Sequence, residues 1–322
     1  MIQITYIATE HVDNGEVATS SQERTEDGWG LPSERQGWPA SSDLLDRRRA
    51  LRALVDKQVV DPGATAHART IADVKCIEVA ARESRGVMMY AHGGGFRMGD
   101  ADLWTGFASR LAVVSGLRII LPDYRLAPEN PFPNSLRDLA AVYRAICVES
   151  PLQHVFVGGD SAGAGLACAV VLNVLAVGTR RPAGAIFFSP WLDLTVAAES
   201  YRSNAATDRS LSRESAMEAA QQYLQGASAQ EPFASPLFAN LTGFPPVLVF
   251  VSASEVLIDD ALTLIGRMSR VGARVEAHVV PDMPHVWPML APGSPETAAA
   301  IETFGRFVGS ACERCAPTLT PP

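Results

Sequence analysis

The sequence predicts an α/β fold with a mainly parallel central sheet, helices on both faces of that sheet and a helical cap. Runs of consecutive apolar residues recur along the chain, which is typical of strands buried on both faces. Amphipathic helical patterns separate several of these runs, and such alternation favours a parallel sheet. One interval, residues 192–240, is polar and rich in Ala and Ser, so we expect it to be an element inserted into the core as part of the cap.

The elements follow one another in a regular order. Residues 1–40 are polar, and a helical pattern begins at Ser42 around the basic triplet Arg47 to Arg49, which we expect to be a solvated helix face. The predicted strands are 74–79, 87–91, 118–121, 155–158, 185–189, 247–252 and 275–280. Helical patterns lie at about 102–114, 135–148, 162–176 and 259–270, and a last helix is predicted to begin after Ser294 as N-cap.

These elements suggest four parts of the chain. Residues 1–60 form an N-terminal extension and part of the cap, residues 61–191 together with 241–312 form the catalytic core, 192–240 is the cap insertion and 313–322 is a flexible tail. A single core is expected although the chain has 322 residues, since α/β folds of this size often form one unit.

Composition excludes several classes of function. The net charge of -8 argues against binding to nucleic acid, which needs clustered Lys and Arg, and gives no reason to expect an anionic membrane as partner. The N-terminus lacks the features of a secretory signal, and no apolar run approaches the roughly 20 residues of a membrane span. The five cysteines are odd in number and mostly lie in apolar segments. We therefore expect a cytoplasmic protein with reduced thiols.

A metal site is not expected. The pair Cys312 and Cys315 has the spacing of half a zinc site, but the sequence offers no second pair to complete the four ligands of a structural zinc. No cofactor motif was found either, so the chemistry is expected to come from side chains alone.

The segment around Ser161 is the most informative in the chain. An apolar run leads into Gly159-Asp160-Ser161-Ala162-Gly163, and an Ala-rich helix follows. This order of strand, sharp turn and helix is the context in which Gly-x-Ser-x-Gly carries a nucleophilic serine. The flanking glycines avoid clashes with neighbouring backbone, and the helix dipole favours negative charge beside the serine. We expect Asp160 to point away from Ser161 and to make structural hydrogen bonds.

A glycine-rich loop follows an earlier strand. His92-Gly93-Gly94-Gly95-Phe96 can bring backbone amides close to a carbonyl oxygen that gains negative charge, and each such donor is worth about 3 kcal/mol in the transition state. We expect Gly93, Gly94 and Gly95 to form this oxyanion loop, with the amides of Gly94, Gly95 and Ala162 as donors. A phosphate-binding loop is the alternative, but no Lys-Ser or Lys-Thr follows. His92 is expected to brace the loop.

A serine nucleophile needs a base and an acid that orients the base. His278 lies within an alternating strand pattern, whereas His285 lies in the loop that follows it, so His285 is the predicted base. Glu255 is the first carboxylate after the strand 247–252 and is favoured as the acid over Asp259 and Asp260. Those two aspartates are expected to cap the next helix and to stabilise its positive end.

Taken together, these motifs resemble the hormone-sensitive lipase family of bacterial esterases, which has the α/β-hydrolase fold. The resemblance covers about residues 73–310 and includes Met283-Pro284-His285 and a run from Asp123 to Glu129. It also includes Ser189-Pro190-Trp191, while the acid position departs from the common Asp-Pro-Leu and has Glu255-Val256-Leu257. The resemblance implies a carboxylester hydrolase for short-chain acyl esters that needs no metal or cofactor and has a cap over its site.

The resemblance leaves several points open. Phe96, Trp191 and Trp287 are candidates for an apolar substrate pocket, with ordinary core packing as the alternative for each. The same machinery could cleave a lactone or an acetyl-amide, and acetyl-hydrolases and monoterpene lactone hydrolases of bacterial secondary metabolism look similar at the acid motif. A ligand-binding protein without activity, like the plant gibberellin receptors, is disfavoured because such proteins tend to lose the histidine. Many relatives pair through an edge strand, so a homodimer is a further option.

Overall fold

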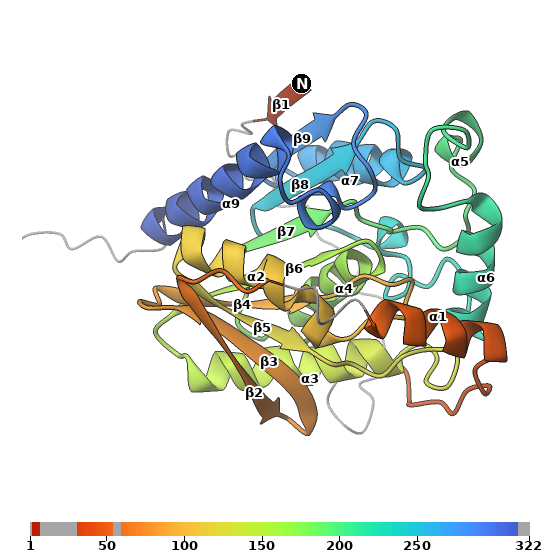
Figure 1. The fold of residues 1–322 in the computed structure, drawn as a ribbon, viewed down its shortest axis with the longest axis horizontal. Coiled ribbons are helices and arrows are strands. Elements are labelled where there is room, and N and C mark those ends of the chain that lie inside the picture. Colours follow the sequence, from red (N-terminus) through yellow and green to blue (C-terminus); the bar gives the residue numbers. More distant parts are fainter. Residues whose placement is uncertain (1, 7–30, 54–58, 315–322) are drawn as a thin grey trace, which may run out of the picture.

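The sheet is the centre of the molecule. A computed structural model describes residues 2–6, 31–53 and 59–314, and in it nine strands form one sheet in the order β1-β9-β8-β7-β6-β4-β5-β3-β2 (Figure 1). Every pairing from β9 to β5 is parallel, and the pairings of β1 with β9, of β3 with β5 and of β2 with β3 are antiparallel. The predicted α/β fold with a mainly parallel sheet is therefore confirmed.

All seven predicted strands are present. They are β3 (Val74–Ala81), β4 (Gly86–Ala91), β5 (Leu117–Pro122), β6 (His154–Asp160), β7 (Gly184–Phe188), β8 (Val247–Ser252) and β9 (Val275–Val280). The strands β1 (Ile2–Tyr6) and β2 (Ala64–Ile71) were not predicted. Both lie at the edges of the sheet, and the partly exposed, polar-rich sequence of β2 lacks the apolar run by which the central strands are recognised.

Helices cover both faces of the sheet. One face packs against α2 (Ala101–Ser115), the short α8 (Trp287–Leu290) and α9 (Pro295–Arg314), and the other packs against α3 (Asn134–Glu149), α4 (Ala162–Val177) and α7 (Ile258–Arg270). The Ser294 hydroxyl accepts a hydrogen bond from the Thr297 amide, which confirms Ser294 as N-cap of α9. The two faces thus form two separate apolar clusters, as a sheet buried on both sides requires.

The helices α1 (Ser42–Arg52), α5 (Ser200–Ser203) and α6 (Arg213–Leu224) lie together at the right of Figure 1, beyond the carboxyl ends of the parallel strands. A short 3-10 helix, η2 (Pro236–Phe238), leads from α6 back towards β8. Most of the predicted N-terminal extension, residues 7–30, and the tail from 315 onwards lie outside the described residues. The four-part division of the chain stays a prediction.

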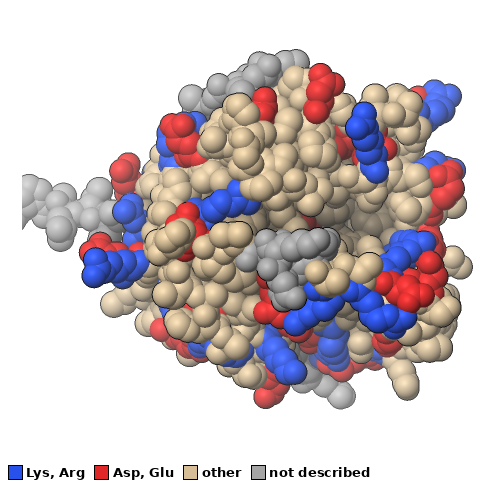
Figure 2. Space-filling view, viewed as in Figure 1, with Lys and Arg blue, Asp and Glu red and all other residues tan. Residues whose placement is uncertain are grey.

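The basic triplet on α1 is only partly a solvated face. Arg47 and Arg49 pair with Asp43 and Asp46 on the same helix, and in Figure 2 basic and acidic side chains alternate around this region. Arg48 contradicts the prediction: its guanidinium donates to Glu129 Oε1 at 2.6 Å and to the carbonyl oxygens of residues 97 and 127 at 2.7 Å each. It therefore fastens α1 to the loops of the core.

No helix within the described residues is long and apolar enough to cross a membrane. In the same part of the chain no group of His, Cys, Asp and Glu side chains is arranged to hold a metal ion, and Cys315, half of the Cys-x-x-Cys pair, lies outside it. The cytoplasmic location and the lack of a cofactor stay predictions.

Candidate active site

The site begins at the turn between β6 and α4. Ser161 has φ of 53°, in the left-handed region, and its amide donates to the Phe188 carbonyl of β7 at 2.9 Å. A Cβ on Gly163 would lie 2.2 Å from each of two carbonyl oxygens, those of Ala91 and His92, so only glycine fits there. This close approach of α4 to the end of β4 holds the serine in its strained conformation at the edge of the sheet.

The structure brings the three predicted side chains together. His285 Nε2 lies 2.9 Å from Ser161 Oγ, and His285 Nδ1 lies 2.6 Å from Glu255 Oε2. With Nδ1 protonated and donating to Glu255, Nε2 is free to accept a hydrogen bond from the serine hydroxyl. All three side chains are buried, so little water competes for these hydrogen bonds.

A further serine, Ser189, contacts both Glu255 and the main chain next to His285, and no role was predicted for it from the sequence. Ser189 follows β7, and its hydroxyl donates to Glu255 Oε1 at 2.7 Å while it accepts the Val286 amide at 3.1 Å. The Ser252 amide donates to the same Glu255 oxygen at 2.8 Å. Both oxygens of the Glu255 carboxylate are therefore occupied by donors, which fixes its orientation towards His285.

Glu255 also affects the pKa of the His285 imidazole. Burial alone would lower the pKa of His285, but the charge of Glu255 and its hydrogen bond outweigh burial, with smaller contributions from the charges of Asp208 and Asp160. The pKa of His285 is therefore raised above its ordinary value of 6.5. A base with a raised pKa takes a proton from a hydroxyl more readily, as long as the pH keeps it neutral.

The glycine loop after β4 lies beside the serine. Gly94 and Gly95 have φ of 113° and 62°, and a Cβ on Gly94 would lie 2.1 Å from the Met98 carbonyl oxygen. Among the described residues no acceptor binds the amides of Gly94, Gly95 or Ala162, the last being the first residue of α4, whose amide has no partner within the helix. The Gly93 amide differs, because it already donates to Asp160 Oδ1 at 3.0 Å.

Asp160 braces this loop through hydrogen bonds to residues other than Ser161. Besides Gly93, its Oδ1 accepts from the Tyr90 hydroxyl at 3.0 Å and from Trp104 Nε1 at 2.7 Å. Burial raises the pKa of Asp160 to about 6, although these donors act in the opposite direction. The predicted structural role of Asp160 is confirmed.

The two other candidate histidines, His92 and His278, make contacts that support the structure. His92 Nδ1 lies 2.8 Å from the Gly93 carbonyl oxygen, its ring stacks on Tyr124, and burial lowers its pKa to about 4. His92 thus braces the loop, as predicted. His278 stacks on Phe250 and contacts Glu276 of its own strand.

A pocket of about 420 Å³ opens above Ser161. Its wall is mainly apolar and comes from the core and from α1 and α6; the lining includes Arg47, Leu51, Met98, Trp191, Leu211, Ala216, Ala219, Leu257, Met289 and Leu290. The sequence analysis had identified only Trp191 in this set as a substrate-binding candidate. The other lining residues belong to separate segments of the chain, which only the fold brings together over Ser161.

The three predicted aromatic residues have three different positions. Trp191 lines the pocket, and Phe96 lies behind it, stacked on Tyr223 with 4.0 Å between ring centres. Trp287 contradicts the prediction of a pocket residue. It is fully buried on the other side of the sheet, where its ring packs edge-on against Phe250 beneath α9. The turn after His285 directs residue 287 into the core and residues 289 and 290 towards the pocket.

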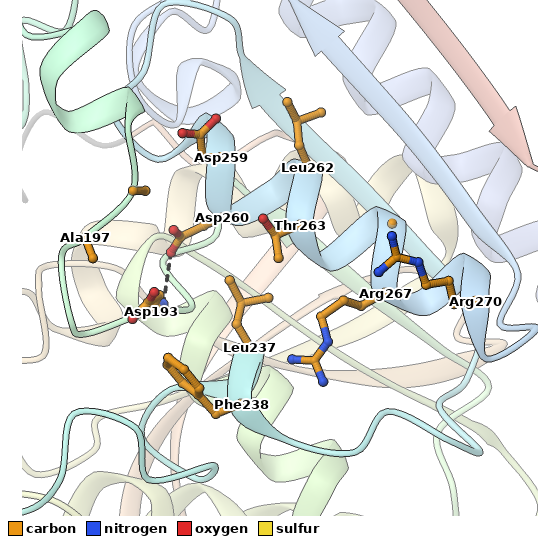
Figure 3. Close-up of a pocket in the computed structure, with 12 residues that line it drawn as sticks. Asp193, Ala197, Leu237, Phe238, Asp259, Asp260, Leu262, Thr263, Arg267 and Arg270 are labelled. Carbon is orange, nitrogen blue, oxygen red and sulfur yellow. Dashed lines mark hydrogen bonds between the residues drawn. The ribbon is translucent and has the colours of Figure 1, made fainter.

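A larger cavity, of about 660 Å³, lies along α7 and does not contain Ser161, Glu255 or His285 (Figure 3). Asp259 and Asp260 lie in the first turn of α7, at its positive end, as predicted, but the prediction that they cap the helix was wrong. Neither side chain caps α7; Asp260 accepts the amides of Leu192 and Asp193 at 2.7 and 2.9 Å, and Asp259 accepts the Ser200 amide at 2.8 Å. These two residues therefore fasten the inserted segment to the core.

Comparisons with known proteins agree with this geometry. Residues 88–289 match a protein family described as having the alpha/beta hydrolase fold. The chain is 36% identical to an acetyl-hydrolase of Streptomyces hygroscopicus over 232 residues, which are 72% of this chain and 78% of that protein. It is 31% identical to an esterase of Acinetobacter venetianus, with 81% and 88% of the two chains covered. The crystal structure of an esterase from the bacterial hormone-sensitive lipase family superposes with a TM-score of 0.80 at 35% identity, and covers 85% of this chain and 93% of that one.

Proposed function

The chain belongs to the hormone-sensitive lipase family of α/β-hydrolases and is a serine carboxylesterase, and from this premise we propose that it cleaves short-chain acyl esters with Ser161 as nucleophile, His285 as base and Glu255 as acid. The observation that carries the proposal is the unbroken chain of contacts from Ser161 through His285 to Glu255, at 2.9 and 2.6 Å. This is the arrangement that turns a weakly nucleophilic hydroxyl into an effective one.

In the acylation step, Ser161 Oγ attacks the ester carbonyl carbon while His285 Nε2 takes the hydroxyl proton. The Glu255 carboxylate stabilises the imidazolium that results, the carbonyl carbon becomes tetrahedral and its oxygen becomes an oxyanion. The bond to the alcohol oxygen then breaks, and His285 gives its proton to the departing alcohol. The acyl group remains bound to Ser161 Oγ.

Deacylation repeats the sequence with water. His285 removes a proton from a water molecule that attacks the acyl carbon, and the second tetrahedral intermediate collapses with return of the proton to Ser161. The carboxylic acid leaves as product. In both steps the amides of Gly94, Gly95 and Ala162 are the proposed oxyanion donors, which is supported by their lack of acceptors among the described residues. Removing one donor of this kind typically costs 10²–10³ in kcat.

The preference for short acyl chains is supported by the size and lining of the pocket. Its volume of about 420 Å³ is near the lower end of the range for small-molecule pockets, and its wall is mainly apolar, which suits a short acyl chain. We propose that α1 and the segment 192–240 together act as the cap, since residues from both line this pocket. A site that closes over its substrate excludes water and strengthens the polar contacts inside.

An acetyl-amide is the alternative substrate, and the similarity to the Streptomyces acetyl-hydrolase supports an acetyl group as its acyl part. The triad chemistry would be the same, because only the leaving group changes from an alcohol to an amine. Lactones are a further option that uses the same steps. A protein that only binds a ligand is not favoured, since the contacts of Ser161, His285 and Glu255 are complete.

The proposal is tested with Ser161→Ala protein and p-nitrophenyl esters of increasing acyl length, with an acetyl-amide and a lactone as further substrates. We expect butyrate hydrolysis to disappear in Ser161→Ala and to persist in Ser228→Ala, whose exposed serine lies away from the site. A fluorophosphonate probe should label the wild type and Ser228→Ala but not Ser161→Ala. Turnover of the butyrate ester by Ser161→Ala at the wild-type rate would refute the mechanism.

A further inference from the structure

The loop that carries Glu255 is held from outside by the inserted segment. Asn204 Nδ2 donates to the carbonyl oxygens of Ala253 and Glu255 at 2.9 and 2.8 Å. The Thr207 hydroxyl donates to the Ser254 carbonyl at 3.0 Å. In this way α5 and the residues after it bind the main chain on both sides of the acid.

Asp208 completes this set of contacts, and it is the charged member. Its Oδ1 accepts the amides of Ser210 and Leu211 at 2.9 and 3.0 Å, which closes a local turn in the inserted segment. Its Oδ2 accepts the amide of Val256, the residue after Glu255, at 2.9 Å. One carboxylate therefore joins the inserted segment to the acid loop.

Asp208 also shares a pocket with the acid–base pair. Asp208, Glu255 and His285 line a polar pocket of about 480 Å³, which is distinct from the pocket above Ser161; His285 lines both. Asp208 lines this polar pocket and does not line the pocket above Ser161. Its charge is among those that raise the pKa of His285.

We propose that Asp208 is a positioning residue for the Glu255–His285 pair, which fixes the acid loop through the Val256 amide and stabilises the imidazolium with its negative charge. The proposal rests on the catalytic roles proposed above for Glu255 and His285. It assigns to the inserted segment a part in the chemistry beyond covering the substrate.

The charged groups that face His285 determine the direction of the effect. Glu255 binds it directly, and Asp208 and Asp160 act on it through their charges. Arg209 and Asp282 line the same polar pocket, and Arg47 and Arg97 line the pocket of Ser161. Removal of the Asp208 charge alone leaves all the others in place, so the imidazolium loses stabilisation and the pKa of His285 falls.

The test is the pH profile of p-nitrophenyl butyrate hydrolysis by Asp208→Asn in the full-length protein. The asparagine oxygen can still accept the amides of Ser210 and Leu211, whereas its NH₂ group would meet the Val256 amide donor to donor. We expect kcat on the plateau to fall about tenfold, as misplaced catalytic groups do. KM should stay unchanged because Asp208 does not line the pocket of Ser161. The midpoint of the acidic limb of kcat/KM should move down by about half a pH unit.

Asp193→Asn is the matched control. Asp193 also lies in the inserted segment and accepts a backbone amide, that of Thr195, at 2.8 Å, but it makes no contact with the acid loop. We expect its profile to coincide with that of the wild type. A midpoint in Asp208→Asn that equals the wild-type value, or lies above it, overturns the proposal whatever the plateau shows.

Two further results separate the possible failures. If Asp208→Asn does not fold, Asp208→Ser replaces it. The shorter neutral side chain can accept the amides of the turn without reaching Val256. If neither variant folds, Asp208 is needed for folding and the proposal is wrong. Loss of activity in Ser161→Ala supports Ser161 as the nucleophile independently of Asp208. Activity that persists in Ser161→Ala would refute the proposed function itself.

Discussion

The Ser189→Ala substitution tests the network that supports the acid and the base. The Ser189 hydroxyl is the only side chain among the described residues that contacts both the Glu255 carboxylate and the main chain next to His285. The change to alanine removes a single oxygen atom and adds no bulk. Glu255 Oε1 then keeps one donor, the Ser252 amide, and the Val286 amide loses its acceptor.

The magnitude follows from these two losses. A hydrogen bond to a charged group contributes about 1.5–3 kcal/mol, and a buried amide left without a partner costs about 1–3 kcal/mol. Since Ser189 is fully buried, no water replaces its oxygen without further rearrangement. We expect the free energy of unfolding to fall by about 3 kcal/mol. We expect kcat to fall by about 10- to 100-fold, because Glu255 and His285 lose their fixed alignment.

The assay combines urea denaturation with steady-state hydrolysis of p-nitrophenyl butyrate. Ser189→Gly is the informative partner variant, since position 189 has φ of 47° and glycine relieves that strain while it also lacks the hydroxyl. Ser189→Gly should be more stable than Ser189→Ala but equally slow. A folded Ser189→Ala protein with kcat within about twofold of the wild type would show that the hydroxyl does not position the pair.

Three other predictions follow from the structure. The acidic limb of kcat/KM should have its midpoint above pH 6.5, because activity needs neutral His285 and the pKa of His285 is raised; a midpoint below that value would contradict the charge effect of Glu255. Burial raises the pKa of Asp260 from 3.8 to about 7, so the folded state holds a proton that the unfolded state releases, and stability should fall by roughly 2 kcal/mol as pH rises from about 5 to 7. Asp260→Asn should lack this part of the pH dependence in urea denaturation, and equal slopes for the two proteins would refute it. Gly163→Ala should yield no active folded protein, since its Cβ would meet two backbone oxygens at 2.2 Å; normal activity and melting temperature would disprove this steric argument.

The parts of the fold that the sequence predicts are those governed by local patterns. The central strands are buried on both faces, and their apolar runs stand out from the surrounding sequence. The edge strand β2 carries Thr, His and Arg at exposed or partly exposed positions, so its sequence fits a loop as well as a strand. The proposed nucleophile Ser161 and the proposed base His285 were predicted because each lies in a short motif directly after a strand.

The predictions that failed depend on distant partners. Arg48 was assigned to a solvated face, but its hydrogen-bond acceptors lie 49 to 81 positions away in the chain. Asp260 was assigned to a helix cap, but it binds amides near residue 192, 68 positions away. Trp287 is two residues from the base, yet the turn after His285 directs its ring into the core. In each case the residue type is known from the sequence, but the direction in which its side chain points is not.

The arrangement of the sheet explains why the site assembles from loops so far apart in the sequence. The strands β9, β8, β7, β6 and β4 are consecutive neighbours and run parallel, so their carboxyl ends lie side by side. In that order the loops after them carry His285, Glu255, Ser189, Ser161 and the glycine loop of residues 93–95. Each strand thus supplies one part of the candidate site, and Ser189 lies between Glu255 and Ser161 because β7 lies between β8 and β6. Sequence patterns identify the loops, but only the strand order shows which of them are neighbours. A serine after the middle strand acquires a role only once that order is known.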